Sequence, residues 1–64
     1  MTTFDFPGHL AEARPDAFAS FVADMLRTNL NYPCTLAIHY AARTESHVFE
    51  TREKLRAFAE AVGA

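Results

Sequence analysis

The sequence predicts a small α+β domain of two layers, a three-stranded sheet with two helices on one face, in the order β-α-β-β-α. Three observations support this. A short run of alternating apolar residues opens the chain, and a segment with apolar residues at helical spacing follows it. In the second half, the apolar period changes from two residues to that of a helix, as in a β-hairpin followed by a helix. The 64 residues, 1–64, contain no repeat or long linker and predict one domain.

The first strand is expected from Thr2 to Phe6. Phe4 and Phe6 flank Asp5, so in an extended segment the two rings lie on one face and the carboxylate lies on the other. The proline and glycine that follow end the run. This strand can pair beside the second strand, in parallel, or beside the third, antiparallel, and the sequence leaves both arrangements open.

The first long helix is expected from Pro15 to about Asn29, after a stretch at 9–13 that can form one helical turn. Proline suits the first position of a helix because its missing amide hydrogen has no partner there. Asp16 in the first turn suits the positive end of the helix dipole. The apolar residues at helical spacing are Phe18, Phe21, Val22, Met25 and Leu26.

The hairpin is predicted to pair Cys34–Ala42 with His47–Thr51 through a loop at Arg43–Ser46. This register places Tyr40 opposite Phe49 on the face that carries Leu36 and Ile38, which we expect to be buried. The same register places His39 opposite Glu50 on the other face. That face is expected to carry Thr35, Ala37, His39, Ala41, Val48 and Glu50.

The last helix is expected to begin after Thr51, whose side chain can cap it, and to end near Gly63. Glu53 lies in its first turn. Its apolar stripe consists of Leu55, Phe58, Ala59 and Val62. Because each helix has a single apolar stripe, both are expected to pack on the same face of the sheet and to leave the other face uncovered. An uncovered face of small residues is either solvated or a docking or dimer surface.

The chemically reactive side chains do not form a recognisable catalytic or metal site. A His39–Glu50 pair could act as a general base, but the sequence places no nucleophile beside it, so a surface pair is the favoured interpretation. The three histidines and Cys34 match no usual spacing of zinc ligands. We therefore expect no enzyme activity, no metal and no cofactor, and we expect Cys34 to be a small buried residue.

Composition limits the class of partner. The net charge of −2 gives no basic footprint for nucleic acid, and the basic residues of the second half are interleaved with glutamates. Asp16, Ser20 and Asp24 recur every four residues on the outer side of the first long helix, where they form either a solvated stripe or a contact for a basic partner. A single cysteine excludes an internal disulfide, and no apolar run has membrane length, so a cytoplasmic location is expected.

In size, acidity, compact mixed fold and absence of a catalytic signature, the chain resembles the small phage-encoded anti-CRISPR proteins. The resemblance implies inhibition by occlusion, in some cases through acidic surfaces that imitate DNA. We therefore expect a non-enzymatic inhibitor that covers a surface of a larger protein or nucleoprotein complex. The alternative is a regulatory or nucleic-acid-associated domain that forms a homodimer through its open sheet face. The candidate contacts are Asp16, Ser20, Asp24, His39 and Glu50.

Overall fold

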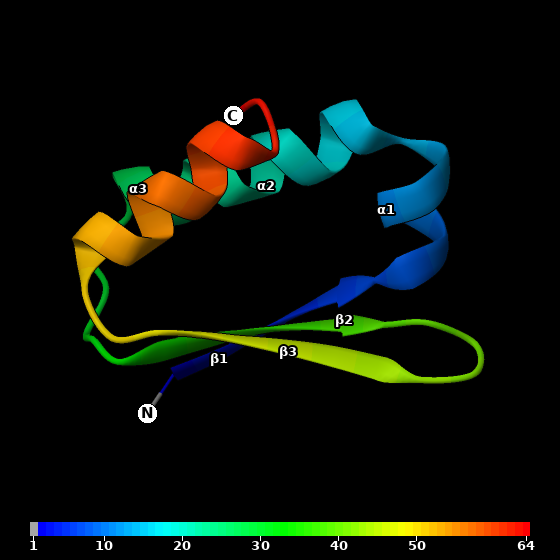
Figure 1. Cartoon of the computed structure of the whole chain (residues 1–64), viewed down its shortest axis with the longest axis horizontal. Helices are drawn as coiled ribbons and strands as arrows, with labels where there is room; N and C mark the ends of the chain where they lie inside the picture. Colours follow the sequence, from blue (N-terminus) through cyan, green and yellow to red (C-terminus); the bar gives the residue numbers. More distant parts are fainter. Residues whose placement is uncertain (1) are drawn as a thin grey trace.

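The computed structural model describes residues 2–64, in which a three-stranded sheet forms one layer and three helices form the other (Figure 1). The predicted α+β class is confirmed, and the helical turn expected at 9–13 is present as a short helix of its own. The element bounds are β1 Thr2–Pro7, α1 Gly8–Ala13, α2 Pro15–Arg27, β2 Cys34–His39, β3 Thr44–Phe49 and α3 Arg52–Ala61.

The helix α2 begins at Pro15 as predicted and buries Phe18, Val22 and Met25, which lie on one face because they are separated by four and three residues. It ends at Arg27, two residues before the expected end. Thr28 takes an extended backbone there, and its hydroxyl donates a hydrogen bond of 2.8 Å to the carbonyl oxygen of Asp24. The last turn of α2 is closed by this bond.

The helix α3 is capped as the sequence predicts. The Thr51 side-chain oxygen accepts a hydrogen bond of 3.3 Å from the backbone N–H of Lys54. Beyond the helix, Gly63 has a φ of +80°, which is the left-handed conformation that glycine adopts most easily at a helix end. The residues of α3 that become buried are Leu55 and Ala59.

The strand order is β1-β2-β3, so β2 is central and the other two strands are edges. The structure selects the parallel alternative for β1, which pairs with β2 from Thr2 opposite Cys34 to Pro7 opposite His39. A parallel neighbour requires a long crossover connection, and α1 with α2 supplies it.

The hairpin loop differs from the predicted one. The loop is formed by residues 40–43 and is closed by a hydrogen bond of 2.8 Å from the Tyr40 N–H to the carbonyl oxygen of Arg43. The segment that we expected to be the loop, Arg43–Ser46, instead starts β3. The predicted strand Cys34–Ala42 is therefore wrong at its loop end, and the predicted strand His47–Thr51 is wrong at both ends, since β3 is Thr44–Phe49.

The pairing register is also wrong, by six positions. Phe49 lies opposite Cys34 and not opposite Tyr40, while His39 lies opposite Thr44 and not opposite Glu50. The observed register pairs all six residues of β2 with β3, whereas the predicted one left 34–37 without partners and their backbone groups unsatisfied. Because six is an even number, every side chain keeps its predicted face.

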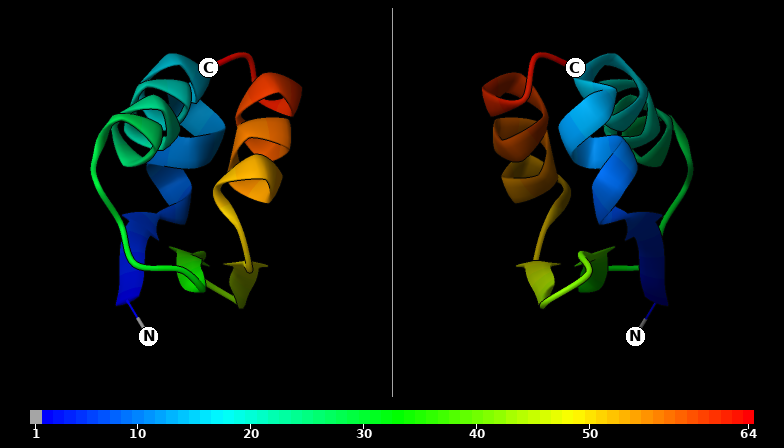
Figure 2. Two further views of the ribbon diagram at one scale, coloured as in Figure 1. Left: turned by 90° about the vertical axis from the view of Figure 1, so that its left-hand side faces the viewer. Right: turned by 90° about the vertical axis from the view of Figure 1, so that its right-hand side faces the viewer.

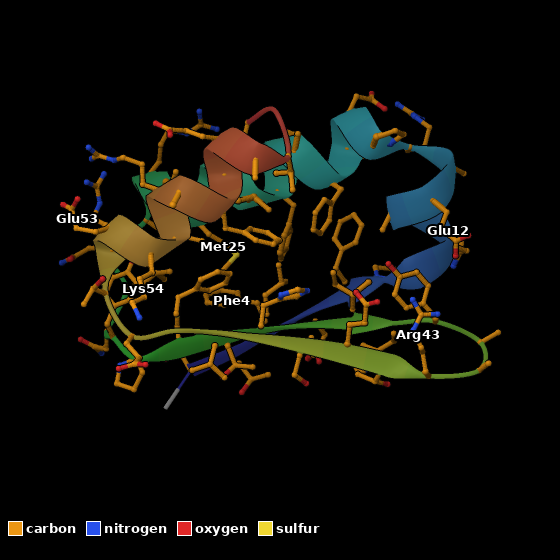
Figure 3. All side chains as sticks on the ribbon, in the orientation of Figure 1. Phe4, Glu12, Met25, Arg43, Glu53 and Lys54 are labelled. Atoms are coloured by element: carbon orange, nitrogen blue, oxygen red, sulfur yellow. The ribbon has the colours of Figure 1, made fainter. Side chains whose placement is uncertain are left out.

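The core lies between the sheet and the helices, with Phe4 of β1 and Met25 of α2 pointing into the space between the layers (Figure 3). Phenylalanine rings connect the layers, with Phe6 packing on Phe18 at 5.2 Å between centroids. Phe18 also contacts Phe58 at 6.2 Å, which joins α2 to α3. The side chains with no exposed surface are Val22, Cys34, Leu36 and Leu55.

All three helices lie on one side of the sheet, and the end-on views show its other side uncovered (Figure 2). The predicted arrangement of helices on a single face is thereby confirmed. None of the helices within residues 2–64 has the length and apolar character needed to cross a bilayer.

Candidate functional site

The uncovered side of the sheet, called the open face below, carries three rows of three side chains. Parallel and antiparallel pairing align residues of β1, β2 and β3 across the sheet. The rows are Thr3, Thr35 and Val48; Asp5, Ala37 and Ser46; and Pro7, His39 and Thr44. The predicted members Thr35, Ala37, His39 and Val48 are present, whereas Ala41 lies in the loop and Glu50 lies past the end of β3.

At one end of the open face, three polar side chains form a continuous hydrogen-bonded chain. His39 Nε2 lies 2.7 Å from Asp5 Oδ1, and His39 Nδ1 lies 3.3 Å from Thr44 Oγ1. The carboxylate accepts from the imidazole, which orients the ring toward the hydroxyl. The backbone register creates the cluster, because Thr44 is directly opposite His39 and Asp5 is two residues before the residue that pairs with it.

This cluster has the order of a carboxylate, an imidazole and a hydroxyl, which in enzymes activates a nucleophile. The His39 and Asp5 side chains of this cluster are 49% and 65% exposed. Within residues 2–64 no cavity or cleft is found. Water therefore reaches all three groups, and the network arranges polar groups on a surface.

Asp5 and Thr44 are members of the cluster that no sequence motif singles out. Asp5 was recognised only as the polar residue between two phenylalanines, and its contact with His39 required knowing that β1 pairs with β2. Thr44 was assigned to the loop. Once the loop is placed at 40–43, the alternation of β3 puts the Thr44 side chain on the same face as His39.

Glu50 is separated from His39 in the structure. It follows β3, is exposed, and lies with its carboxylate 3.9 Å from Lys54 Nζ of α3. The predicted His39–Glu50 pair is thus wrong, since the register that supported it is not formed.

The acidic stripe of Asp16, Ser20 and Asp24 lies exposed on α2 as its spacing indicates. Each carboxylate has an arginine partner close by. Asp16 accepts two hydrogen bonds from Arg14, at 3.2 and 3.0 Å, and Asp24 pairs with Arg27. The Arg14 hydrogen bonds lower the pKa of the Asp16 carboxyl and raise that of the guanidinium. The stripe is therefore locally neutralised.

A second cluster lies at the hairpin end of the helix side. The Arg43 guanidinium sits 4.4 Å from the centre of the Tyr40 ring and donates a hydrogen bond of 2.7 Å to Glu45. This contact lowers the pKa of the Glu45 carboxyl. Glu12 of α1 lies at the same end of the molecule (Figure 3). His47 follows along β3, with Nε2 3.7 Å from Glu45 Oε1.

The groups considered as metal ligands are spread over the molecule. Cys34 is in the core, and burial raises the pKa of its thiol. His39 lies on the open face, His47 lies on the helix side of β3, and His9 is exposed on α1. In the described part of the chain, no three histidine, cysteine or carboxylate groups converge on one point.

Comparison with protein-family models, with curated proteins and with solved structures finds no match for this chain.

Proposed function

We propose that this protein is a non-enzymatic interaction module that docks its open face on a larger protein and acts by covering that protein's surface. The observation that carries the proposal is the sheet face left free by three helices on one side (Figure 2). Its side chains are short, and Val48 is 55% exposed, so another surface can approach closely. Small residues also lose little side-chain entropy when a partner covers them.

The chemistry of the open face favours a protein over nucleic acid. Its nine side chains include no lysine, arginine, phenylalanine, tyrosine or tryptophan, and their aromatic residue is His39. Phosphate binding needs positive charge, and recognition of single-stranded bases needs stacking rings. The Phe49 ring of β3 lies on the helix side and is buried, and the Tyr40 ring of the hairpin loop is half-buried.

The partner that fits is a folded protein with a flat apolar patch and a basic group at its rim. Val48 supplies apolar contact, while Thr3 and Ser46 can donate and accept hydrogen bonds. Asp5 is the acidic residue of the face and is 65% exposed at the side chain, so it can meet an arginine or lysine of the partner.

The proposal is tested by immobilising the full chain and comparing retention from a nuclease-treated bacterial lysate with that of two variants. Asp5→Arg replaces a negative charge with a positive one on the open face. Asp24→Arg makes the same replacement on the outer side of α2. Retention of a protein complex by the wild type and by Asp24→Arg, but not by Asp5→Arg, supports docking through the open face. Loss of retention with Asp24→Arg alone assigns the binding site to the acidic stripe. Equal retention by all three proteins rejects both sites.

The finer proposal is that the partner is a cytoplasmic CRISPR effector complex and that docking inhibits it. Its support is the resemblance in size and character to anti-CRISPR proteins. Expression in a bacterium with active CRISPR immunity tests it: plating of a targeted phage should recover, and Asp5→Arg should abolish the recovery. No recovery with the wild type rejects the CRISPR partner, and the open face remains testable by the retention experiment.

A further inference from the structure

The outer edge of β3 presents an unpaired row of backbone groups. The hydrogen bond between Tyr40 and Arg43 belongs to a directly opposed pair, and such pairs alternate along an antiparallel ladder. The backbone groups of Glu45, His47 and Phe49 therefore point toward β2. Those of Thr44, Ser46 and Val48 point away from the sheet, where no other strand of the described chain lies.

This edge lacks most features that protect edge strands from pairing. The six residues of β3 contain no proline and no lysine, and their register with β2 is continuous, without a bulge. The other edge strand, β1, ends in Pro7, which has no amide hydrogen to donate. The acidic side chain of β3 is that of Glu45, which points to the helix side and is 39% exposed. A generic apolar strand would cover this carboxylate with Arg43 as its hydrogen-bond donor and would add no donor of its own.

A second copy of the same strand can supply a hydrogen-bond donor to the Glu45 carboxylate. If two β3 strands pair antiparallel about an axis through Ser46, Thr44 lies opposite the partner's Val48, and Ser46 lies opposite the partner's Ser46. Glu45 then lies opposite the partner's His47, and the same contact is repeated on the other side of the axis. These two pairs are not hydrogen-bonded through the backbone, so their side chains approach most closely. The imidazole can donate to the carboxylate in either protonation state.

The side chain of His47 is positioned by α3 and is partly exposed. Its ring packs on Phe58 of α3 at 5.0 Å between centroids, and its side chain is 36% exposed. The helix α3 rises from the Phe49 end of β3 and covers that end (Figure 1). Rotation about an axis through Ser46 moves the partner's α3 to the opposite end of the strand, so the two helices do not occupy the same place.

We propose that this protein forms a symmetric dimer in which the two β3 strands pair antiparallel about Ser46 to make one six-stranded sheet. The open faces of the two copies then join into one surface. A single open face has a projected area of roughly 280 Å², from strand spacing and rise per residue. A stable protein interface buries about 800 Å² on each side. Pairing doubles the surface offered, and the inference holds whatever the open face binds.

The register is tested by mixing two charge variants, Glu45→Lys and His47→Glu. In a dimer of Glu45→Lys alone, the new lysine lies opposite the partner's imidazole. In a dimer of His47→Glu alone, two glutamates lie opposite each other. Mixed, the new lysine faces the new glutamate, and the remaining histidine faces the remaining glutamate. Native mass spectrometry should show dimers for the wild type, about tenfold weaker dimers for each variant alone, and heterodimers in the mixture. Failure of the mixture to restore dimers rejects this register.

The edge itself is tested by Ser46→Pro, which removes the outward-pointing N–H and leaves the bonds of β3 to β2 in place. The matched control Ser46→Ala keeps the N–H. Circular dichroism checks that both fold, and multi-angle light scattering over a concentration series should give a monomer for the proline variant and a dimer for the control. A wild type that is monomeric up to millimolar concentration overturns the proposal. So does a dimer that Ser46→Pro leaves intact, and loss of that dimer in Thr3→Arg would then locate it on the open face.

Discussion

Gly8 begins α1 directly against Tyr40, and its missing side chain makes this contact possible. A Cβ atom at Gly8 would lie 2.5 Å from Tyr40 Cδ1 and 2.8 Å from the carbonyl oxygen of His39. Both neighbours are held, one as a ring stacked under Arg43 and the other as sheet backbone. We predict that Gly8→Ala lowers the free energy of unfolding by about 1–3 kcal/mol, measured by urea denaturation.

A double-mutant cycle with Tyr40→Ala identifies the cause of that loss. If the ring is the obstacle, Gly8→Ala should cost less in the Tyr40→Ala background than in the wild type. An equal cost in both backgrounds would assign the effect to the backbone oxygen or to the glycine's own conformation.

The ion pair of Asp16 and Arg14 predicts a pH dependence of stability. The folded pKa of Asp16 is below its unfolded value because Arg14 donates hydrogen bonds to the carboxylate. The stabilisation is therefore complete above the unfolded pKa, near pH 4, and is lost as the pH falls through the folded value. We predict that the urea midpoint falls between pH 5 and pH 2 and that Asp16→Asn makes this decrease shallower.

Arg14→Gln is the matched control, since it removes the donor and keeps the carboxylate. It should also make the decrease shallower, although less than Asp16→Asn, because the backbone at the start of α2 also stabilises the ionised carboxylate. Curves identical to the wild type for both variants would contradict the assignment.

At the scale of elements, α3 depends on one side-chain cap. Thr51 accepts from the backbone N–H of Lys54, which would otherwise have no partner within the helix. We predict that Thr51→Ala lowers the free energy of unfolding by about 1 kcal/mol and that Thr51→Ser, which keeps the oxygen, costs less than half as much. Urea denaturation of the three proteins measures both. If Thr51→Ser lowers the free energy of unfolding as much as Thr51→Ala does, the side-chain cap contributes little.

The crossover between β1 and β2 is the element that assembles the polar cluster of the open face. Because α1 and α2 return the chain to the same end of the sheet, β1 lies parallel to β2 and brings Asp5 beside His39. An antiparallel β1 beside β3 would have left His39 with Thr44 as its neighbour on one side and solvent on the other.

For the whole molecule, stability depends on a core of a few large side chains. A chain of 64 residues has a free energy of unfolding of roughly 3–10 kcal/mol. Leu36 has no exposed surface, and we predict that Leu36→Ala costs about 2–5 kcal/mol, enough to remove most of the stability. Leu10→Ala on α1, at a residue that is 37% exposed, should cost about 1 kcal/mol or less. Thermal unfolding followed by circular dichroism compares the stability of the two variants. Similar losses of stability for Leu36→Ala and Leu10→Ala would contradict this description of the core.

Much of the fold could be predicted because each element has its own local signal. Proline at the start of α2, threonine before α3 and glycine after it act through contacts within a few residues. The faces of the hairpin strands were also predicted correctly, since the alternation of Leu36 and Ile38 does not depend on the register.

The pairing could not be predicted from local signals. The loop residues Tyr40 and Arg43 carry no turn signature, and several registers differing by two positions bury the same faces. The observed one is selected by backbone bonds along all of β2 and by the position of Phe49 beside Cys34. For the candidate site, the sequence identified His39 but not its partners.

By itself, the sequence determined the approximate positions of the strands and of α2 and α3, and which side of each faces the core, because apolar spacing and capping residues act over short distances. Only the tertiary structure decided that β1 runs beside β2, that Asp5 and Thr44 meet His39, and that β3 is left as an unprotected edge. These features depend on contacts between residues up to 34 positions apart. Such contacts are set by how the whole chain satisfies its backbone and fills its core.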